Sequence, residues 1–108
     1  MATVLEIATA HFTAQQASYL GTVTVSEWLD NAVPVELDIS HATQADIIAI
    51  QSGRNRLGAQ GAIIWTVMRR CWRDDARVFA DTDEQTLLNS VDPVVLKSIA
   101  DAIVALES

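Results

Sequence analysis

Two stretches in which apolar and polar residues alternate constrain the fold more than any other feature of this sequence. Residues 22–28 read TVTVSEW and residues 33–39 read VPVELDI, and both follow the period of two that is typical of strands. Residues 29–32 between them, Leu-Asp-Asn-Ala, have the composition of a turn. The pattern predicts a β-hairpin over about residues 22–39 with one wet face. Pro34 lacks the N–H that a sheet ladder needs, so its strand is expected at a sheet edge.

After Ser40 the apolar spacing becomes helical, and we expect three to four helices there. Thr43 with Asp46 three residues later is an N-terminal helix signal. Residues 52–61, SGRNRLGAQG, hold three of the four glycines and are either a loop between two helices or a weak point in one. Residues 62–73, AIIWTVMRRCWR, predict a central helix that is apolar nearly all round.

The C-terminal third predicts a turn over residues 74–79, with a short extended piece, followed by two helices. Asp81 is the expected cap of the first, whose Leu87 and Leu88 would face inward. Asp92 and Pro93 are a cap and first helical residue for the second. Its inward stripe consists of Val95, Ile99, Ala102, Ile103 and Leu106.

The first twenty residues predict a short helix with Thr13 and Gln16 as a capping box and Gly21 as the positive-φ residue that closes it. The fold class expected from all these elements is α+β and mostly helical. At 108 residues, the chain is expected to form a single domain over residues 1–108. MATVLEIATA has no basic region typical of a signal peptide, and the most apolar stretch, residues 62–68, is far shorter than the ~20 residues of a membrane helix.

Charge is distributed in three blocks. Residues 1–53 carry −6, residues 54–77 carry +4 and residues 78–108 carry −5, which gives the net charge of −7. Most of this surface would repel a polyanion such as DNA. The six arginines of the middle block fit three interpretations: side chains lying along a helix end, contacts to acidic surface on a neighbouring copy, or a nucleic-acid patch, which is the least favoured.

No catalytic or metal-binding motif is present. Residues 53–58 have the glycine spacing of a phosphate loop, but Ala59 and Gln60 stand where Lys and Ser or Thr are needed. His11 and His41 have no metal-ligand spacing to Cys71. The acids at residues 81–84 suit helix capping better than a cation site. Cys71 is interpreted as a small buried hydrophobe rather than a reactive thiol between arginines. We therefore expect no enzyme, no cofactor and no metal.

The order of motifs resembles that of the tail assembly chaperones of long-tailed (siphophage-type) bacteriophages. VTVSEWLDNAVPVEL is similar to that family's opening V-x-V-P-E-W…V-x-V-R-x-L, and RDDARVFADTDEQTLLNSVDPVVLKSIADAIVAL is similar to its C-terminal half. The resemblance covers about residues 20–108. Ser26 replaces a proline, and Ala76 replaces a turn glycine that a positive φ would favour. The matching positions are Glu27, Trp28, Asp74, Phe79, Asp83, Leu87 and Pro93.

The resemblance implies a protein that binds the tape measure protein, keeps it soluble and helps to recruit tail tube subunits. It also implies self-association, a place in the host cytoplasm and absence from the mature virion, with no membrane partner. The alternatives are another small head–tail component of a phage and, less favoured, a nucleic-acid-binding regulator. The candidate interaction surface consists of Trp65, Arg69, Arg70, Trp72, Arg73, Arg77, Ile99 and Ile103.

Overall fold

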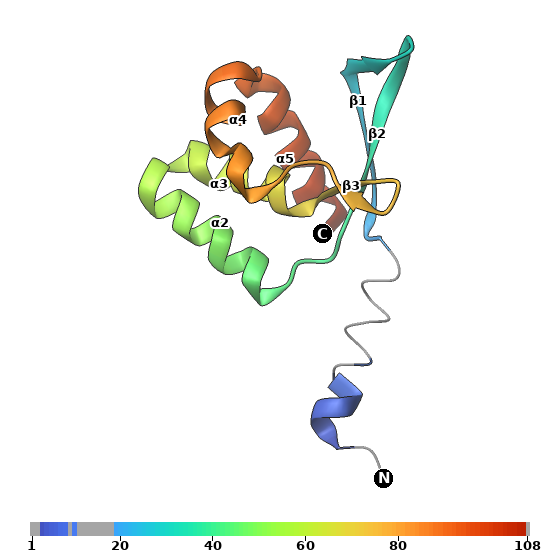
Figure 1. The fold of residues 1–108 in the computed structure, drawn as a ribbon, viewed down its shortest axis with the longest axis vertical. Helices are drawn as coiled ribbons and strands as arrows, with labels where there is room; N and C mark the ends of the chain where they lie inside the picture. Colours follow the sequence, from blue (N-terminus) through green and yellow to red (C-terminus); the bar gives the residue numbers. More distant parts are fainter. Residues whose placement is uncertain (1–2, 9, 11–18, 108) are drawn as a thin grey trace.

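A computed structural model describes residues 3–8, 10 and 19–107 of the chain. The described part contains a four-stranded antiparallel sheet in the order β1-β2-β3-β4, with helices packed against it. In Figure 1 the β1–β2 hairpin rises as an arm beside the helices, and the short β3 crosses its base. The predicted α+β, mostly helical fold class with a hairpin is confirmed.

The hairpin consists of β1 (Gly21–Asp30) and β2 (Val33–Ile39), as the alternating pattern predicts. Asn31 and Ala32 connect the strands with φ values of 52° and 65°, the left-handed pair of a type I′ turn. The register runs from Gly21↔Ile39 to Val25↔Val35 and shifts before Leu29. Inward side chains are buried near the base of the arm and become exposed toward its tip. The arm therefore offers partly uncovered apolar surface.

β2 is an internal strand of the sheet, so the prediction that it is an edge strand is wrong for the strand as a whole. The strand β3 (Cys71–Arg73) pairs with it only at Asp38↔Trp72 and Ile39↔Cys71, and β3 pairs in turn with β4 (Ala76–Arg77). Pro34 lies farther along β2, where β1 is the only strand partner among the residues that the structure describes. Proline cannot donate a hydrogen bond to a neighbouring strand, and at this position it does not need to, as the prediction assumed.

The central helix α3 (Ala59–Arg70) begins and ends earlier than the sequence predicts, because the chain leaves the helix after Arg70 to form β3. The backbone N–H of Ser40 donates to the carbonyl of Arg70 at 3.0 Å, which brings the end of β2 to the end of α3. Trp72 consequently lies on a strand and not on the helix predicted over residues 62–73. Asp74 and Asp75 form the next turn with φ values of 53° and 61°. Ala76 follows that turn in β4 without a positive φ.

The helix α2 (Gln44–Leu57) begins with a capping box, in which Asp46 N–H donates to Thr43 Oγ1 at 3.0 Å and Thr43 N–H donates to Asp46 Oδ2 at 2.9 Å. The glycine-rich residues 52–61 are mostly helical. The break between α2 and α3 is confined to Gly58, whose φ is 74°. Gly53 and Gly61 lie where the two helices meet, and a Cβ on Gly61 would overlap the carbonyl oxygen of Gly53. These glycines allow a close helix–helix approach.

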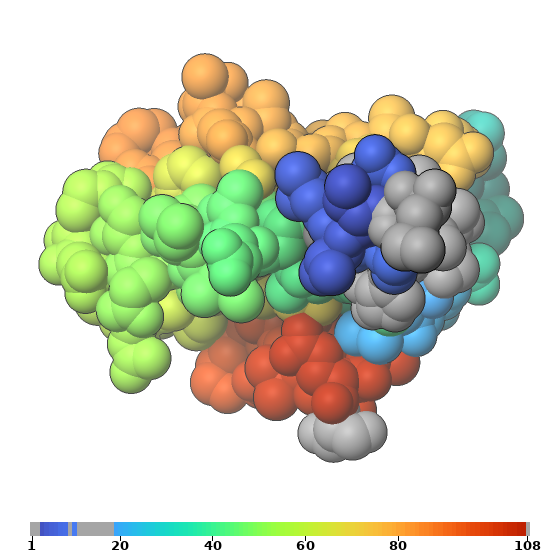
Figure 2. All heavy atoms as spheres, turned by 90° about the horizontal axis from the view of Figure 1, so that it is seen from below, coloured from blue at the N-terminus to red at the C-terminus, as the bar shows by residue number. Residues whose placement is uncertain are grey.

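The chain ends with a 3₁₀ turn, η1 (Asp81–Asp83), followed by α4 (Glu84–Ser90) and α5 (Pro93–Glu107). Asp92 caps α5 as predicted, since its Oδ1 accepts from Val94 N–H at 2.9 Å. Two predictions here are wrong. Asp81 binds arginines rather than capping a helix, and Leu88 is 38% exposed. Figure 2 shows the C-terminal part of α5 beside the start of β1.

The main core lies between the sheet and the helices α3, α4 and α5. It includes Val23, Val25, Leu37, Ile39, Ile64, Val67, Met68, Cys71, Leu87, Val95, Leu96, Ile99 and Ile103.

The N-terminal predictions are tested only in part. Residues 4–8 are helical, whereas Thr13 and Gln16 lie outside the described residues. Gly21 does not close a helix with a positive φ. It begins β1, where a Cβ would meet Leu106 Cδ2 at 2.7 Å. The close approach of α5 to the sheet therefore accounts for this glycine.

Candidate functional site

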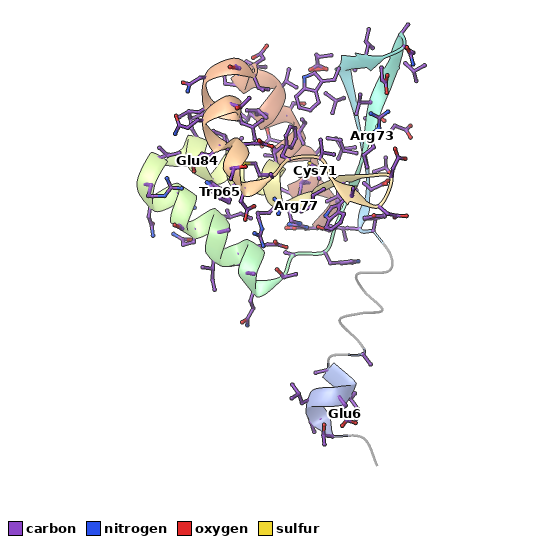
Figure 3. All side chains as sticks on the ribbon, in the orientation of Figure 1. Glu6, Trp65, Cys71, Arg73, Arg77 and Glu84 are labelled. Atoms are coloured by element: carbon purple, nitrogen blue, oxygen red, sulfur yellow. The ribbon has the colours of Figure 1, made fainter. Side chains whose placement is uncertain are left out.

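The indole of Trp65 is tied into the fold by a carboxylate. Trp65 is half-buried on α3, and its Nε1–H donates to Glu84 Oε2 at 2.5 Å. Arg56 of α2 binds both oxygens of the same carboxylate, at 3.2 Å and 2.6 Å. Figure 3 shows Trp65 and Glu84 close together. The hydrogen bond from Arg56, followed by that from Trp65, lowers the pKa of Glu84. This cluster joins α2, α3 and α4, so Trp65 is a structural residue in the folded chain.

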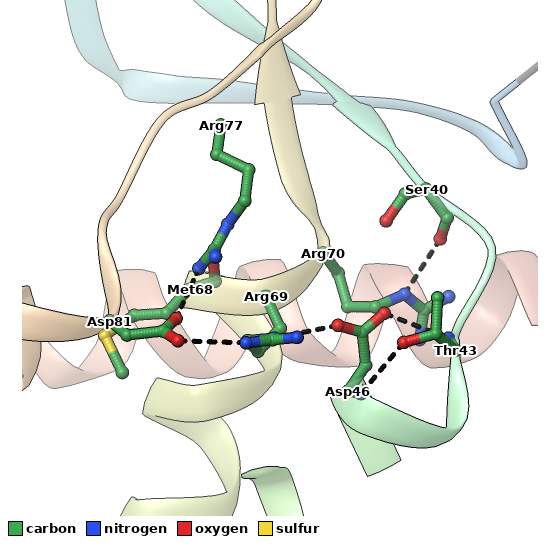
Figure 4. A network of polar contacts seen from close by, with 8 residues as sticks. All are labelled: Ser40, Thr43, Asp46, Met68, Arg69, Arg70, Arg77 and Asp81. Carbon is green, nitrogen blue, oxygen red and sulfur yellow. Dashed lines mark hydrogen bonds and ion pairs between the residues drawn. The ribbon is translucent and has the colours of Figure 1, made fainter. Parts of the chain in front are cut away.

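A second polar cluster fixes Arg69 and Arg77 (Figure 4). Arg69 reaches Asp46 at 2.8 Å and Asp81 at 2.9 Å, which connects α2, α3 and η1. Arg77 donates to the carbonyl of Met68 at 2.6 Å and to Asp81 at 2.8 Å. The hydrogen bond from Arg77 is the main cause of the lowered pKa of Asp81. Two arginines of the candidate interaction surface are therefore engaged within the chain.

Arg70 is buried, with only 4% of its surface exposed, although it was expected to face a partner. Its Nε–H donates to the carbonyl of Ser40 at 2.8 Å, and its Nη1 pairs with Glu107 at 2.5 Å. Ile99 and Ile103 are 2% and 0% exposed. These three residues belong to the interior of the folded chain, so their assignment to an accessible surface is wrong. The sequence pattern identifies apolar faces but does not say which of them the chain itself covers.

Cys71 is fully buried on β3, in agreement with its interpretation as a small hydrophobe. Burial raises the pKa of the Cys71 thiol to about 12, and the neighbouring Arg70 offsets only part of this effect. The thiolate is therefore a negligible species near neutral pH. Trp72, the next residue, is half-buried and lies on the sheet rather than on a helix.

Two of the motif positions meet in an apolar groove. The rings of Trp28 and Phe79 pack edge to face, with centroids 6.2 Å apart and planes at 73°. They line a groove of about 430 Å³ between the hairpin arm and the segments before α4 and α5. Its other lining residues are Val35, Leu37, Arg73, Val78, Ser90, Val91 and Asp92. The sequence does not single out Val35, Val78 or Val91, because only the tertiary fold brings them together.

The remaining motif positions have structural roles or lie at the surface. Asp83 accepts a hydrogen bond from Ala80 N–H at 2.8 Å, which stabilises η1. Leu87 is a core residue and Pro93 is the first residue of α5. Glu27 and Asp74 are exposed, the first on β1 and the second in the turn after β3.

A second groove, of about 490 Å³, lies on the outward face of the hairpin and is the more polar of the two. It shares Arg73 with the apolar groove, and Arg73 also pairs with Asp30 at 2.8 Å. Its lining residues are Thr24, Val33, Pro34, Glu36, Asp38, Arg73 and Asp74. The hairpin therefore has a mainly apolar groove on one face and, on the other, a groove lined by three carboxylates and Arg73.

Large apolar side chains are also exposed on several other elements. Residues 4–8 expose Val4, Leu5 and Ile7, the hairpin tip exposes Leu29 and Val33, and α2 exposes Ile47 and Ile48. Val94 and Val104 do the same on α5. Surface apolar residues that lie apart from one another are ordinary, but apolar surface that forms a groove is typical of binding sites. The Trp28–Phe79 groove is therefore the stronger candidate.

Comparisons with protein-family models, with curated proteins and with solved structures find no match for this chain. Within the described residues, no helix has both the length and the apolar character needed to cross a lipid bilayer. The same residues contain no group of three or more His, Cys, Asp or Glu side chains placed to hold a metal ion.

Proposed function

We propose that the chain is a phage tail assembly chaperone that binds the tape measure protein, keeps it soluble and helps to recruit tail tube subunits. The observation that carries the proposal is the meeting of Trp28 and Phe79 in one apolar groove. These residues stand at two motif positions of the resemblance and come from opposite halves of the chain. A shared binding surface gives a physical reason for both motifs.

The groove has the size and character expected of a client-binding surface. A volume of about 430 Å³ lies within the ~300–1,000 Å³ of ordinary ligand pockets, and its walls are mostly apolar. A chaperone of this kind must cover apolar side chains of its client and later release them. A shallow surface groove permits such reversible contact better than an enclosed cavity.

The engagement of the arginines disfavours the nucleic-acid alternative. Arg56, Arg69, Arg70, Arg73 and Arg77 all pair with carboxylates of the same chain. A phosphate backbone would have to compete with these intramolecular partners, and the chain carries a net charge of −7. The other alternative, a component that stays in the virion, is distinguished by mass spectrometry of purified particles, from which a chaperone is absent.

Co-expression with the tape measure protein from the same gene cluster tests the proposal. We expect the tape measure protein to become soluble and to co-purify with the chain. Val78→Asp places a charge in the groove and should reduce recovery of the complex by about tenfold, the effect of ~1.4 kcal/mol. Ile48→Asp makes a comparable change on exposed α2 and should leave recovery unchanged.

Two results would contradict the proposal. The first is a tape measure protein whose solubility does not respond to the chain at all. The second is equal recovery with Val78→Asp and Ile48→Asp, which would separate the groove from client binding. Circular dichroism of both variants confirms that each remains folded before recovery is compared.

A further inference from the structure

Part of β2 has a backbone edge that is paired with no strand of residues 3–8, 10 and 19–107. β2 pairs with β1 on one side along its length, but β3 covers its other side only at Asp38 and Ile39. Within the described residues, no strand pairs with that side of β2 from Val33 to Leu37. Figure 1 shows this distal part of β2 rising above β3. An exposed strand edge is a template for pairing with another extended chain.

Two backbone contacts show which groups point to this edge. The carbonyl of Ile39 accepts from Leu20 N–H at 2.7 Å on the β1 side, and Ser40 N–H donates to Arg70 at 3.0 Å on the β3 side. Backbone direction alternates along a strand, so the even-numbered residues of β2 point away from β1. Glu36 therefore directs both its N–H and its C=O to the uncovered edge, and Pro34 directs its C=O there.

The two grooves lie on the two faces of the sheet beside this edge. Val35 and Leu37 contribute to the apolar groove, whereas Pro34, Glu36 and Asp38 contribute to the polar one. Side chains of an added strand would alternate between the same two faces. One set would enter the Trp28–Phe79 groove, and the other would lie against the carboxylates of Glu36, Asp38 and Asp74.

Arg73 now occupies the space between the two grooves. It lines both of them, and its guanidinium pairs with Asp30 near the tip of the hairpin. Figure 3 places Arg73 beside β2, above β3. The side chains of Arg73 and Asp30 are 44% and 52% exposed, and exposed ion pairs stabilise a protein by only ~0–1 kcal/mol. A partner could displace this side chain at little cost.

We propose that the distal edge of β2 binds an extended segment of a partner protein in which apolar and basic residues alternate. The segment adds to the sheet as a strand, inserts its apolar side chains beside Trp28 and Phe79, and pairs its lysines or arginines with the outer carboxylates. Displacement of Arg73 leaves Asp30 free to accept one of these cations. This inference rests on the proposed function, which identifies the partner as the client. It adds the place on the chain where that client binds.

The charges of the chain argue against binding of a second copy of the same chain at the uncovered edge of β2. The chain's own alternating stretches, residues 22–28 and 33–39, carry Glu and Asp but no Lys or Arg. Adding either stretch to β2 would bring carboxylates next to Glu36 and Asp38. Like charges placed opposite each other in a sheet are destabilising.

The test uses two dye-labelled synthetic peptides of roughly seven residues, a usual strand length, one alternating Val with Lys and the other Val with Glu. Fluorescence anisotropy measures binding to the full chain, and ¹H–¹⁵N spectra locate it. We expect the Val-Lys peptide to bind at least about tenfold more tightly than the Val-Glu peptide. Its chemical-shift changes should concentrate at residues 33–37 and 78–79.

Two variants and a matched control separate edge binding from general charge attraction. Glu36→Lys should weaken binding of the Val-Lys peptide by about tenfold. Asp101→Lys changes the net charge equally on α5, away from both grooves, and should have a much smaller effect. Arg73→Ala should strengthen binding, because it uncovers the edge.

Several results would overturn the inference: shift changes located elsewhere, equal weakening by Glu36→Lys and Asp101→Lys, or a concentration-dependent dimer of Arg73→Ala that excludes the peptide. Peptide binding at β2 without a tape measure complex would support the inference and remove the proposed function. A tape measure complex without peptide binding at β2 would support the proposed function and remove the inference.

Discussion

At the scale of single residues, the contact between Gly53 and Gly61 leaves no room for a Cβ atom on Gly61. A Cβ on Gly61 would overlap the backbone carbonyl of Gly53, which cannot move without shifting α2. Alanine is intrinsically favoured over glycine in a helix by ~1 kcal/mol, so helix propensity alone predicts that Gly61→Ala stabilises the protein. We expect the opposite sign, a loss of ~1–3 kcal/mol from overpacking, measured by urea unfolding.

Gly21→Ala is the matched control for this substitution. A Cβ on Gly21 would meet the side-chain end of Leu106, which can rotate away. The loss should therefore be smaller than for Gly61→Ala. A Gly61 variant as stable as the wild type would contradict the close approach of α2 and α3.

At the scale of elements, two helices have an aspartate at or near their N-terminus, and the two aspartates act in different ways. Asp92 caps α5 through Val94 N–H, and its loss in Asp92→Ala should cost ~1 kcal/mol. Asp46 accepts from Thr43 N–H and also binds Arg69 at 2.8 Å. Asp46→Ala should lower the free energy of unfolding by ~1.5–3 kcal/mol more than Asp92→Ala does. The reason is that it also removes a hydrogen bond to a charged group, and such bonds are stronger. Thermal unfolding followed by circular dichroism ranks the two variants, and equal losses would contradict a stabilising Asp46–Arg69 contact.

Elements whose signals are local were predictable from the sequence, and those that depend on distant pairing were not. The hairpin, the Thr43 cap and the Asp92–Pro93 start are encoded within a few residues, and the structure has all three. Residues 71–73 instead continue a helical pattern in the sequence. They form β3 because the end of β2, some thirty residues earlier, pairs with them. Helix propensity is a weak preference that such tertiary pairing overrides.

The candidate site was predictable only as separate motifs. Trp28 and Phe79 are visible as matching positions, but their mutual contact and the contributions of Val35, Val78 and Val91 arise from the fold. The arginine block was assigned wrongly for a different reason. Four of its members were placed on the candidate interaction surface, although side chains lying along a helix end were also an open interpretation, and the folded chain brings acids from both ends to most of the block.

At the scale of the whole molecule, the three charge blocks of the sequence are joined through ion pairs. The middle block pairs with Asp30 and Asp46 from the N-terminal block, and with Asp81, Glu84 and Glu107 from the C-terminal block. Individual exposed ion pairs contribute little to stability. Asp81 and Glu84, however, each accept hydrogen bonds from two side chains and so connect several elements. Acid should therefore weaken the fold through these two carboxylates in particular.

The pKa values of both carboxyl groups are lowered in the folded chain, Asp81 chiefly by its hydrogen bond to Arg77 and Glu84 chiefly by that to Arg56. Their contribution to stability is complete above the unfolded-state pKa values of ~3.9 and ~4.3, and it is lost as pH falls through the lower folded-state values. We expect the free energy of unfolding, measured in urea, to decrease steeply below pH ~4. The double variant Asp81→Asn/Glu84→Gln should be less stable at neutral pH but should lose less stability on acidification. Identical acid dependence in the variant and the wild type would show that other carboxylates control the response.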